Sequence, residues 1–113
     1  SEATALAIKS GVDLSKLYEV LTHSTGDCTA VRTRLPVAGV VPDSPASNGW
    51  QPGFMADLMG KDVGLALNFA AGAKVPMWST ALARQVLTAA SVAGYGREDF
   101  SALAKVIFGL AGV

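Results

Sequence analysis

Residues 54–72 read FMADLMGKDVGLALNFAAG, and this stretch predicts a strong helix over 54–71. Gly72 stands where a left-handed C-cap is expected, so the helix should close there. Only three residues of the helix are charged, namely Asp57, Lys61 and Asp62. The helix is therefore largely apolar, and any charge-based chemistry on it depends on these three side chains.

Two further helices are predicted on the C-terminal side. Pro76 marks the entry to a helix that begins at about Met77 or Ser79 and runs to Ala93, where Gly94 ends it. The positions expected on its inner face are Leu82, Val86, Ala89, Ala90 and Ala93. The last helix spans Arg97 to Leu110, and its apolar stripe is Phe100, Leu103, Ala104, Ile107 and Ala111.

Three shorter helices are predicted on the N-terminal side. The first covers residues 1–10 and is stopped by Gly11. Asp13 caps the second, which ends near residues 22–26, and Asp27 caps the third, which runs to about Thr33. Residues 37–52 form an irregular connector of a length that is uncommon unless it binds something or covers the core. Strand-like alternation is absent, so we predict an all-α fold of five to six helices in one domain, residues 1–113.

The composition excludes several classes of function. Nine Lys and Arg balance nine Asp and Glu, so no net positive charge favours nucleic acid. No run reaches the ~18 apolar residues of a transmembrane helix, so no membrane partner is expected. The lone Cys28 and the lone His23 supply no metal site, and we expect a buried thiol and an imidazole at a helix end. Only 16% of the residues are charged and the mean hydropathy is +0.38, which indicates that part of the surface faces another domain or subunit.

The helix over 54–71 carries one polar stripe, made of Asp57, Lys61, Gly64 and Asn68 at helical spacing. One interpretation is an exposed ion pair between Asp57 and Lys61. The other is functional. Asp62 lies on an apolar side of the helix, where a carboxylate needs a partner or water, and Gly60 and Gly64 would let something flat approach the backbone beside Lys61. The apolar residues on the side of Asp62 are Met55, Leu58, Leu65, Ala66 and Phe69.

The same helix carries a signature that resembles a known family. Gly53 and Phe54, followed by LMGKDVGLA over residues 58–66, resemble the cofactor-side signature of the β-hydroxyacid dehydrogenases, which commonly reads G-F followed by L-x-x-K-D-L-G-L-A. The loop PVAGVVP over 36–42, with Pro45, Ala46 and Asn48, resembles the proline-rich segment of 3-hydroxyisobutyrate dehydrogenases. Gly94-Tyr95 and Asp99-Phe100-Ser101 are similar to the family's closing pattern G-x-x-x-x-D-F-S. The resemblance covers essentially the whole chain.

The resemblance implies a fold and a site. The fold is that of the C-terminal domain of 6-phosphogluconate dehydrogenase-type enzymes, a helical domain for cofactor contact and oligomerisation, with the N-terminal Rossmann domain outside this chain. Lys61 would lie near the nicotinamide dinucleotide, Phe54 would wall the cleft, and Asp62 would hold the local geometry. The family's catalytic lysine lies upstream, in a G-x-x-x-K-x-x-N context that this chain lacks, so we expect no catalytic residue and no metal ligand here.

The activity implied by the resemblance is the oxidation of 3-hydroxyisobutyrate to methylmalonate semialdehyde with NAD, a step of valine catabolism, and NADP is not excluded as cofactor. The enzyme would be a homo-oligomer, a dimer or tetramer, in the bacterial cytoplasm or the mitochondrial matrix of a eukaryote, and the 113 residues alone would be inactive. Two alternatives stay open. One is a related reductase of tartronate or succinate semialdehyde, and the other is a helical dimerisation module without enzymatic activity.

Overall fold

Six α-helices build the fold, as the computed structural model of residues 1–113 shows. No strand is present, and the only β-type pairing is an isolated bridge between Met55 and Asp99. Short 3-10 turns cover Pro45–Ser47 and Phe100–Leu103, and a π-turn covers Ser91–Tyr95. The helices are α1 Glu2–Lys9, α2 Leu14–Thr22, α3 Thr29–Arg34, α4 Ala56–Gly72, α5 Trp78–Ala90 and α6 Ala104–Ala111. The predicted all-α single-domain fold is confirmed.

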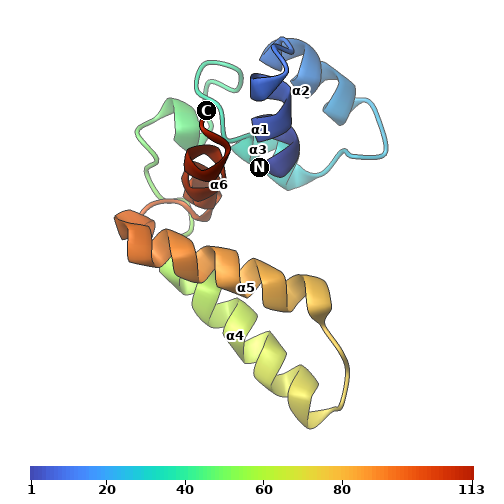
Figure 1. Ribbon diagram of the computed structural model, residues 1–113, viewed down its shortest axis with the longest axis vertical. Helices are drawn as coiled ribbons and strands as arrows, with labels where there is room; N and C mark the ends of the chain where they lie inside the picture. Colours follow the sequence, from blue (N-terminus) through green and yellow to red (C-terminus); the bar gives the residue numbers. More distant parts are fainter.

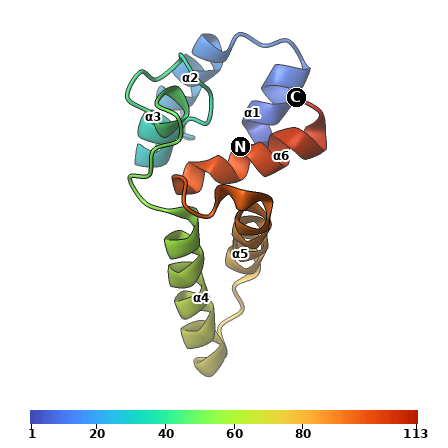
Figure 2. The same ribbon diagram turned by 90° about the vertical axis from the view of Figure 1, so that its left-hand side faces the viewer.

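Helices α4 and α5 form an antiparallel arm that projects from the rest of the molecule (Figure 1). The other four helices gather at one end of the arm, where α6 packs against both α1 and α5 (Figure 2). The molecule is therefore elongated, with extents of 44 × 31 × 25 Å. None of the helices combines the length and the apolar character that crossing a membrane requires.

The short N-terminal helices follow the predicted boundaries, with one exception. Asp13 caps α2, since its carboxylate accepts a hydrogen bond from the N–H of Lys16 at 2.9 Å. Gly11 has a φ of +69° and ends α1, as expected. Asp27, however, does not cap α3, which starts at Thr29 without a side-chain cap. The expected buried thiol is also wrong, because Cys28 is exposed.

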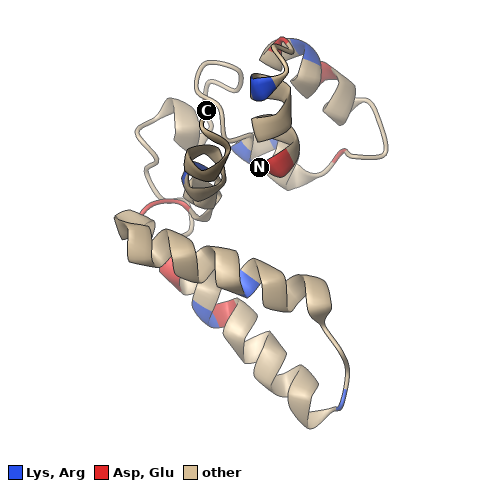
Figure 3. Ribbon diagram, viewed as in Figure 1, with Lys and Arg blue, Asp and Glu red and all other residues tan.

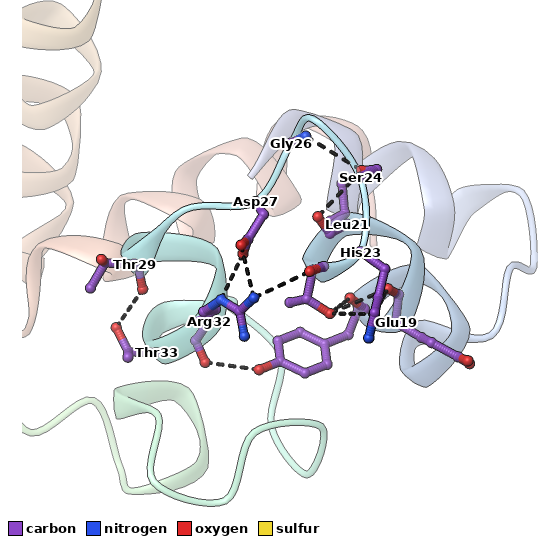
Figure 4. A network of polar contacts seen from close by, with 11 residues as sticks. Glu19, Leu21, His23, Ser24, Gly26, Asp27, Thr29, Arg32 and Thr33 are labelled. Atoms are coloured by element: carbon purple, nitrogen blue, oxygen red, sulfur yellow. Dashed lines mark hydrogen bonds and ion pairs between the residues drawn. The ribbon is translucent and has the colours of Figure 1, made fainter.

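Asp27 instead forms an ion pair with Arg32 that ties α3 to the end of α2 (Figure 4). The Arg32 guanidinium lies 2.8 Å from each carboxylate oxygen and also donates to the carbonyl of Thr22 at 3.3 Å. The hydrogen bond to Asp27, and then its charge, raise the pKa of Arg32 above its ordinary value. His23 follows the last residue of α2, so the expected helix-end imidazole is confirmed.

The end of α4 differs from the prediction. Gly72 is still helical, and the N–H of Ala73 continues the pattern by donating to the carbonyl of Phe69 at 3.0 Å. The left-handed residue comes later, at Lys74, whose φ is +58°. The chain therefore turns towards α5 by a lysine in an unfavourable backbone conformation rather than by the glycine.

The contact between α4 and α5 is built from small residues. Ala56, Gly60 and Ala70 are the buried residues of α4, and Leu87 and Ala90 are those of α5. Of the five inner-face positions predicted for α5, only Ala90 is buried, whereas Leu82 is 65% exposed. The prediction of that face was wrong, because Leu82 and Val86 line an open hollow beside α6 and not a closed core, whereas the buried contact with Gly60 of α4 is made by Leu87.

Gly60 and Gly64 make room for a side chain of α5. A Cβ atom at Gly60 would lie 3.2 Å from Nη1 of Arg84, and one at Gly64 would lie 3.6 Å from its Nε. The Arg84 guanidinium therefore lies along the side of α4 where both glycines are found, and its Nη1 donates to the hydroxyl of Thr88 at 2.7 Å. These glycines are explained by helix packing.

The start of α4 is fixed by the buried carboxylate of Asp99. Its Oδ2 accepts the N–H groups of Gly53 at 3.1 Å and Phe54 at 3.2 Å. Its Oδ1 accepts the N–H of Ser101 at 3.1 Å and the hydroxyl of the same residue at 2.7 Å. Nε of Arg34 lies 3.5 Å from Oδ2, and the Arg34 guanidinium stands over the ring of Phe100. Asp99 thus joins the segment before α4 to the turn before α6.

Burial by itself raises the pKa of the Asp99 carboxyl, because a charge is costly away from water. The hydrogen bonds from the hydroxyl and N–H of Ser101, and from the N–H groups of Phe54 and Gly53, outweigh this effect and hold the pKa below its ordinary value of 3.8. The folded state therefore favours the ionised carboxylate, which stabilises the fold at neutral pH.

We expect Asp99→Asn to lower the free energy of unfolding at pH 7 by about 2–5 kcal/mol, because the amide group would face the N–H donors of Gly53 and Phe54. The unfolded chain takes up the Asp99 proton at a higher pH than the folded chain, so the stabilisation by Asp99 is present above about pH 3.8 and is lost as the pH falls through the folded pKa. Urea unfolding followed by circular dichroism between pH 7 and 2.5 measures both effects. Equal acid sensitivity of the two proteins would contradict this role.

The glycine contacts predict opposite outcomes for two similar substitutions. Gly64→Ala should raise the free energy of unfolding by about 0.5–1 kcal/mol, since its Cβ would make an ordinary contact and alanine favours the helix. Gly60→Ala should gain less or nothing, because the Arg84 guanidinium must move. In an Arg84→Gln background Gly60→Ala should recover the gain. A double-mutant cycle by urea unfolding tests this, and equal effects of Gly60→Ala in both backgrounds would refute the coupling.

Candidate functional site

Lys61 and Asp62 lie together on the outside of α4. The Lys61 ammonium is 2.6 Å from Oδ1 of Asp62, and the two side chains are 60% and 50% exposed. The ion pair predicted between Asp57 and Lys61 is absent. Asp57 lies instead against Gly96, where any Cβ atom would collide with its carboxylate, and its N–H donates to the Gly96 carbonyl at 3.0 Å.

The side of α4 that carries Asp62 is a surface in this chain. Leu58 and Leu65 are exposed there, and Phe69 is 80% exposed. The expectation that Asp62 needs a partner on an apolar side is met by the neighbouring ammonium of Lys61. The apolar residues themselves have no cover within the 113 residues.

Phe54 lies directly before α4, in the segment that Asp99 holds. Its N–H donates to Asp99, its carbonyl accepts the N–H of Phe100 at 2.8 Å, and its ring is half-buried. Lys61 lies five residues after Ala56, the first residue of the helix, which corresponds to a rise of about 7.5 Å along the axis. The three predicted cofactor-side residues therefore lie at the start and in the first half of α4.

The neighbourhood of Lys61 is less open than the sequence predicted. The place beside Gly60 and Gly64, expected to admit something flat, is taken by the flat guanidinium of Arg84. Asn68 is exposed, and so are Asp57 and Lys61. The polar stripe thus reaches solvent, with an arginine of α5 along its glycine edge.

No cavity of this chain contains the candidate site. Three hollows are present, and none is lined by Phe54, Lys61 or Asp62. The largest, about 460 Å³, lies between the end of α3 and the connector and is lined by Arg34, Asn48, Gln51 and Gly53 among others. No group of three or more His, Cys, Asp or Glu side chains is placed to hold a metal ion. The candidate residues can enclose a ligand only together with a second surface.

Charge is concentrated on one part of the arm. Figure 3 shows that the charged residues of α4 lie in its first half, whereas its second half carries none. Lys61 offers an exposed ammonium, and Phe54, seven positions earlier, offers an aromatic ring; a nicotinamide dinucleotide combines the oxyanions and the flat rings that such groups bind. The residues present therefore fit the cofactor that the sequence pattern implied.

Sequence reasoning missed several residues whose contacts join distant parts of the fold. Asp99 was noted only as part of a pattern, Arg84 was not singled out, and neither was Lys105, whose ammonium lies between the rings of Trp50 and Tyr95. Their partners are far away in the sequence, so local spacing carried no signal of these contacts.

Comparison with known proteins identifies the family. Residues 1–107 match the family model described as the NAD-binding domain of NADP-dependent 3-hydroxyisobutyrate dehydrogenase. A probable 3-hydroxyisobutyrate dehydrogenase of Mycobacterium tuberculosis is 44% identical over 105 residues, which are 91% of this chain and 35% of that protein. The mitochondrial 3-hydroxyisobutyrate dehydrogenase of Mus musculus is 40% identical over 103 residues, 91% of this chain and 31% of that protein.

Solved structures agree with this assignment. The structure of Mycobacterium tuberculosis 3-hydroxyisobutyrate dehydrogenase with L-serine superposes with a TM-score of 0.87 at 40% identity, over 94% of this chain and 36% of that one. The Salmonella typhimurium 3-hydroxyisobutyrate dehydrogenase ygbJ gives a TM-score of 0.77 at 31% identity, over 93% of this chain and 34% of that one. The chain spans about a third of the length of these relatives. It belongs to the family of the NAD-binding domain of 3-hydroxyisobutyrate dehydrogenases.

Proposed function

We propose that this chain is the C-terminal, cofactor-side domain of an NAD-dependent 3-hydroxyisobutyrate dehydrogenase, which oxidises 3-hydroxyisobutyrate to methylmalonate semialdehyde in valine catabolism. The observation that carries the proposal is the exposed Lys61–Asp62 pair in the first half of α4, on a chain whose family is defined by NAD binding. Relatives of Mycobacterium and of mammals are named for this activity.

In this proposal the chain supplies one wall of the site. The Lys61 ammonium donates hydrogen bonds to oxygens of the cofactor or of the substrate carboxylate, and Asp62, 2.6 Å away, holds the amine in place. The ring of Phe54, anchored through Asp99, limits the cleft and excludes water from it. A nicotinamide dinucleotide held at this wall would supply the hydride acceptor. The proton of the substrate hydroxyl is taken up by a group outside this chain, so no catalytic residue is assigned here.

The exposed apolar surface of this domain indicates that other protein surfaces cover it. Leu65, Phe69, Trp78 and Leu82 are large, exposed and located on the arm of α4 and α5. Apolar surface of this extent is typical of interfaces. We propose that an N-terminal Rossmann domain of the same protein and a second subunit cover it, in a dimer or tetramer. The same surface is the observation that favours the alternative of a dimerisation module without enzymatic activity.

We propose NAD as the cofactor, with NADP as the alternative that the description of the family model also names, and a reducing compartment, the bacterial cytoplasm or the mitochondrial matrix, as the location. The free, exposed thiol of Cys28 suits such a compartment. Substrate choice between 3-hydroxyisobutyrate and tartronate or succinate semialdehyde is tested by a substrate panel on the enzyme that contains this chain.

Lys61→Gln in the enzyme that contains this chain should weaken NAD binding or lower kcat/KM by about tenfold or more, because a charge-assisted hydrogen bond is lost. The matched control is Lys74→Gln, an exposed lysine in the turn between α4 and α5. Calorimetric titration with NAD and steady-state kinetics measure the effect. Unchanged values for Lys61→Gln would favour the dimerisation module.

The purified 113-residue chain should show no oxidation of 3-hydroxyisobutyrate. In the proposal it supplies only one wall of the cofactor site, and the group that accepts the proton lies outside this chain. NADH absorbance with the enzyme that contains the chain as positive control measures this. Turnover that co-purifies with the chain and disappears in Lys61→Gln would show that the chain holds its own catalytic group.

A further inference from the structure

The ammonium of Lys105 is enclosed by three side chains from other parts of the fold. It lies 4.8 Å from the centroid of the Trp50 ring, 4.6 Å from that of the Tyr95 ring, and 2.6 Å from Oε2 of Glu98. Lys105 belongs to α6, Tyr95 ends the π-turn, and Trp50 lies at the end of the connector. These four residues, the Lys105 cluster, are only partly exposed.

The cluster holds a residue whose backbone is strained. Trp50 has a φ of +61°, in the left-handed region that a tryptophan rarely adopts. Its N–H donates to the carbonyl of Pro45 at 2.7 Å, and its carbonyl accepts the N–H of Asp99 at 3.1 Å. A cation over the indole face is attractive, so Lys105 favours the position that Trp50 takes.

Trp50 is the first residue of the short segment that ends with Phe54. The last two residues of this segment, Gly53 and Phe54, are held by the Asp99 carboxylate, and the middle residues Gln51 and Pro52 are exposed. Asp99 therefore holds the backbone of the segment at both ends, through its N–H at Trp50 and through its carboxylate at Gly53 and Phe54, and the Lys105 cluster holds the side chain of Trp50. The Trp50 side chain is thus a further anchor, four positions before the ring of Phe54.

We propose that Lys105 is a positioning residue of the dehydrogenase: by holding Trp50 it fixes the segment 50–54 and so sets the place of the Phe54 ring at the cofactor cleft. This inference rests on the proposed function, in which Phe54 walls that cleft. Lys105 itself touches neither cofactor nor substrate, because its ammonium is already surrounded by two rings and a carboxylate.

The test uses the enzyme that contains this chain, labelled with 5-fluorotryptophan, with the Trp50 resonance assigned by its loss in Trp50→Phe. Lys105→Met keeps the length of the side chain and removes the cation. It should shift the Trp50 resonance and raise the Kd for NAD about threefold to tenfold. Lys105→Arg, which keeps a cation near both rings, should restore both values. The control Lys16→Met removes an exposed ion pair with Glu19 and should change neither.

Two results would overturn the proposal. One is a shifted Trp50 resonance with Kd, KM and kcat within twofold of the parent enzyme, which would make the cluster merely structural. The other is an unshifted resonance in Lys105→Met. If Lys105→Met does not fold, Glu98→Gln is the milder variant, and it should change the Trp50 resonance and the Kd for NAD by less.

Lys61→Gln separates failure of the positioning role from failure of the proposed function. If Lys61→Gln weakens NAD binding and Lys105→Met does not, only the positioning role of Lys105 fails. If neither variant weakens NAD binding, the proposed function fails.

Discussion

The buried carboxylate of Asp99 is the constraint on which the arrangement of this fold depends. A charge without solvent contact is tolerated only when hydrogen-bond donors surround it, and here the backbone of Gly53, Phe54 and Ser101 supplies them together with the Ser101 hydroxyl. The donors come from two segments that the length of α4 and α5 separates. Satisfying one carboxylate therefore brings the start of α4 to the start of α6 and fixes where the arm leaves the body.

Helical periodicity predicted the helices but not all of their bounds, since the helix predicted from Arg97 to Leu110 is a 3-10 turn over Phe100–Leu103 followed by α6, and it did not predict the faces that the helices bury. Capping by Asp13 and the stop at Gly11 were predicted because they act over a few residues. The buried face of α5 was predicted wrongly, because the face that packs depends on how closely α4 and α5 approach each other. The two helices approach each other at Gly60 of α4, and larger apolar side chains of α4, such as Leu65 and Phe69, lie on the surface.

The residues of the candidate site were predicted from a sequence motif. The long-range contacts around them were not predicted. Phe54, Lys61 and Asp62 are near one another in the sequence, so a family signature contains all three. The structure places Phe54 before α4 and the other two residues in its first half, while their contact with a cofactor stays a prediction. The contacts of Arg84 and Lys105 join residues that are distant in the sequence, and such pairs become neighbours only through the packing of whole helices.

The two halves of the arm differ in a way that fits their proposed tasks. The start of α4 is tied to the body by four N–H groups: those of Gly53 and Phe54 donate to the Asp99 carboxylate, and those of Ala56 and Asp57 donate to backbone carbonyls of residues 98 and 96. The second half exposes the ring of Phe69, as the first residue of α5 exposes the ring of Trp78. A group that must meet a cofactor within a fraction of an ångström needs rigid support, whereas an apolar surface acquires its order from the partner that covers it. Lys61 belongs to the supported half, so the backbone from which its side chain extends is held by the body of the domain, while the ammonium itself contacts the neighbouring Asp62.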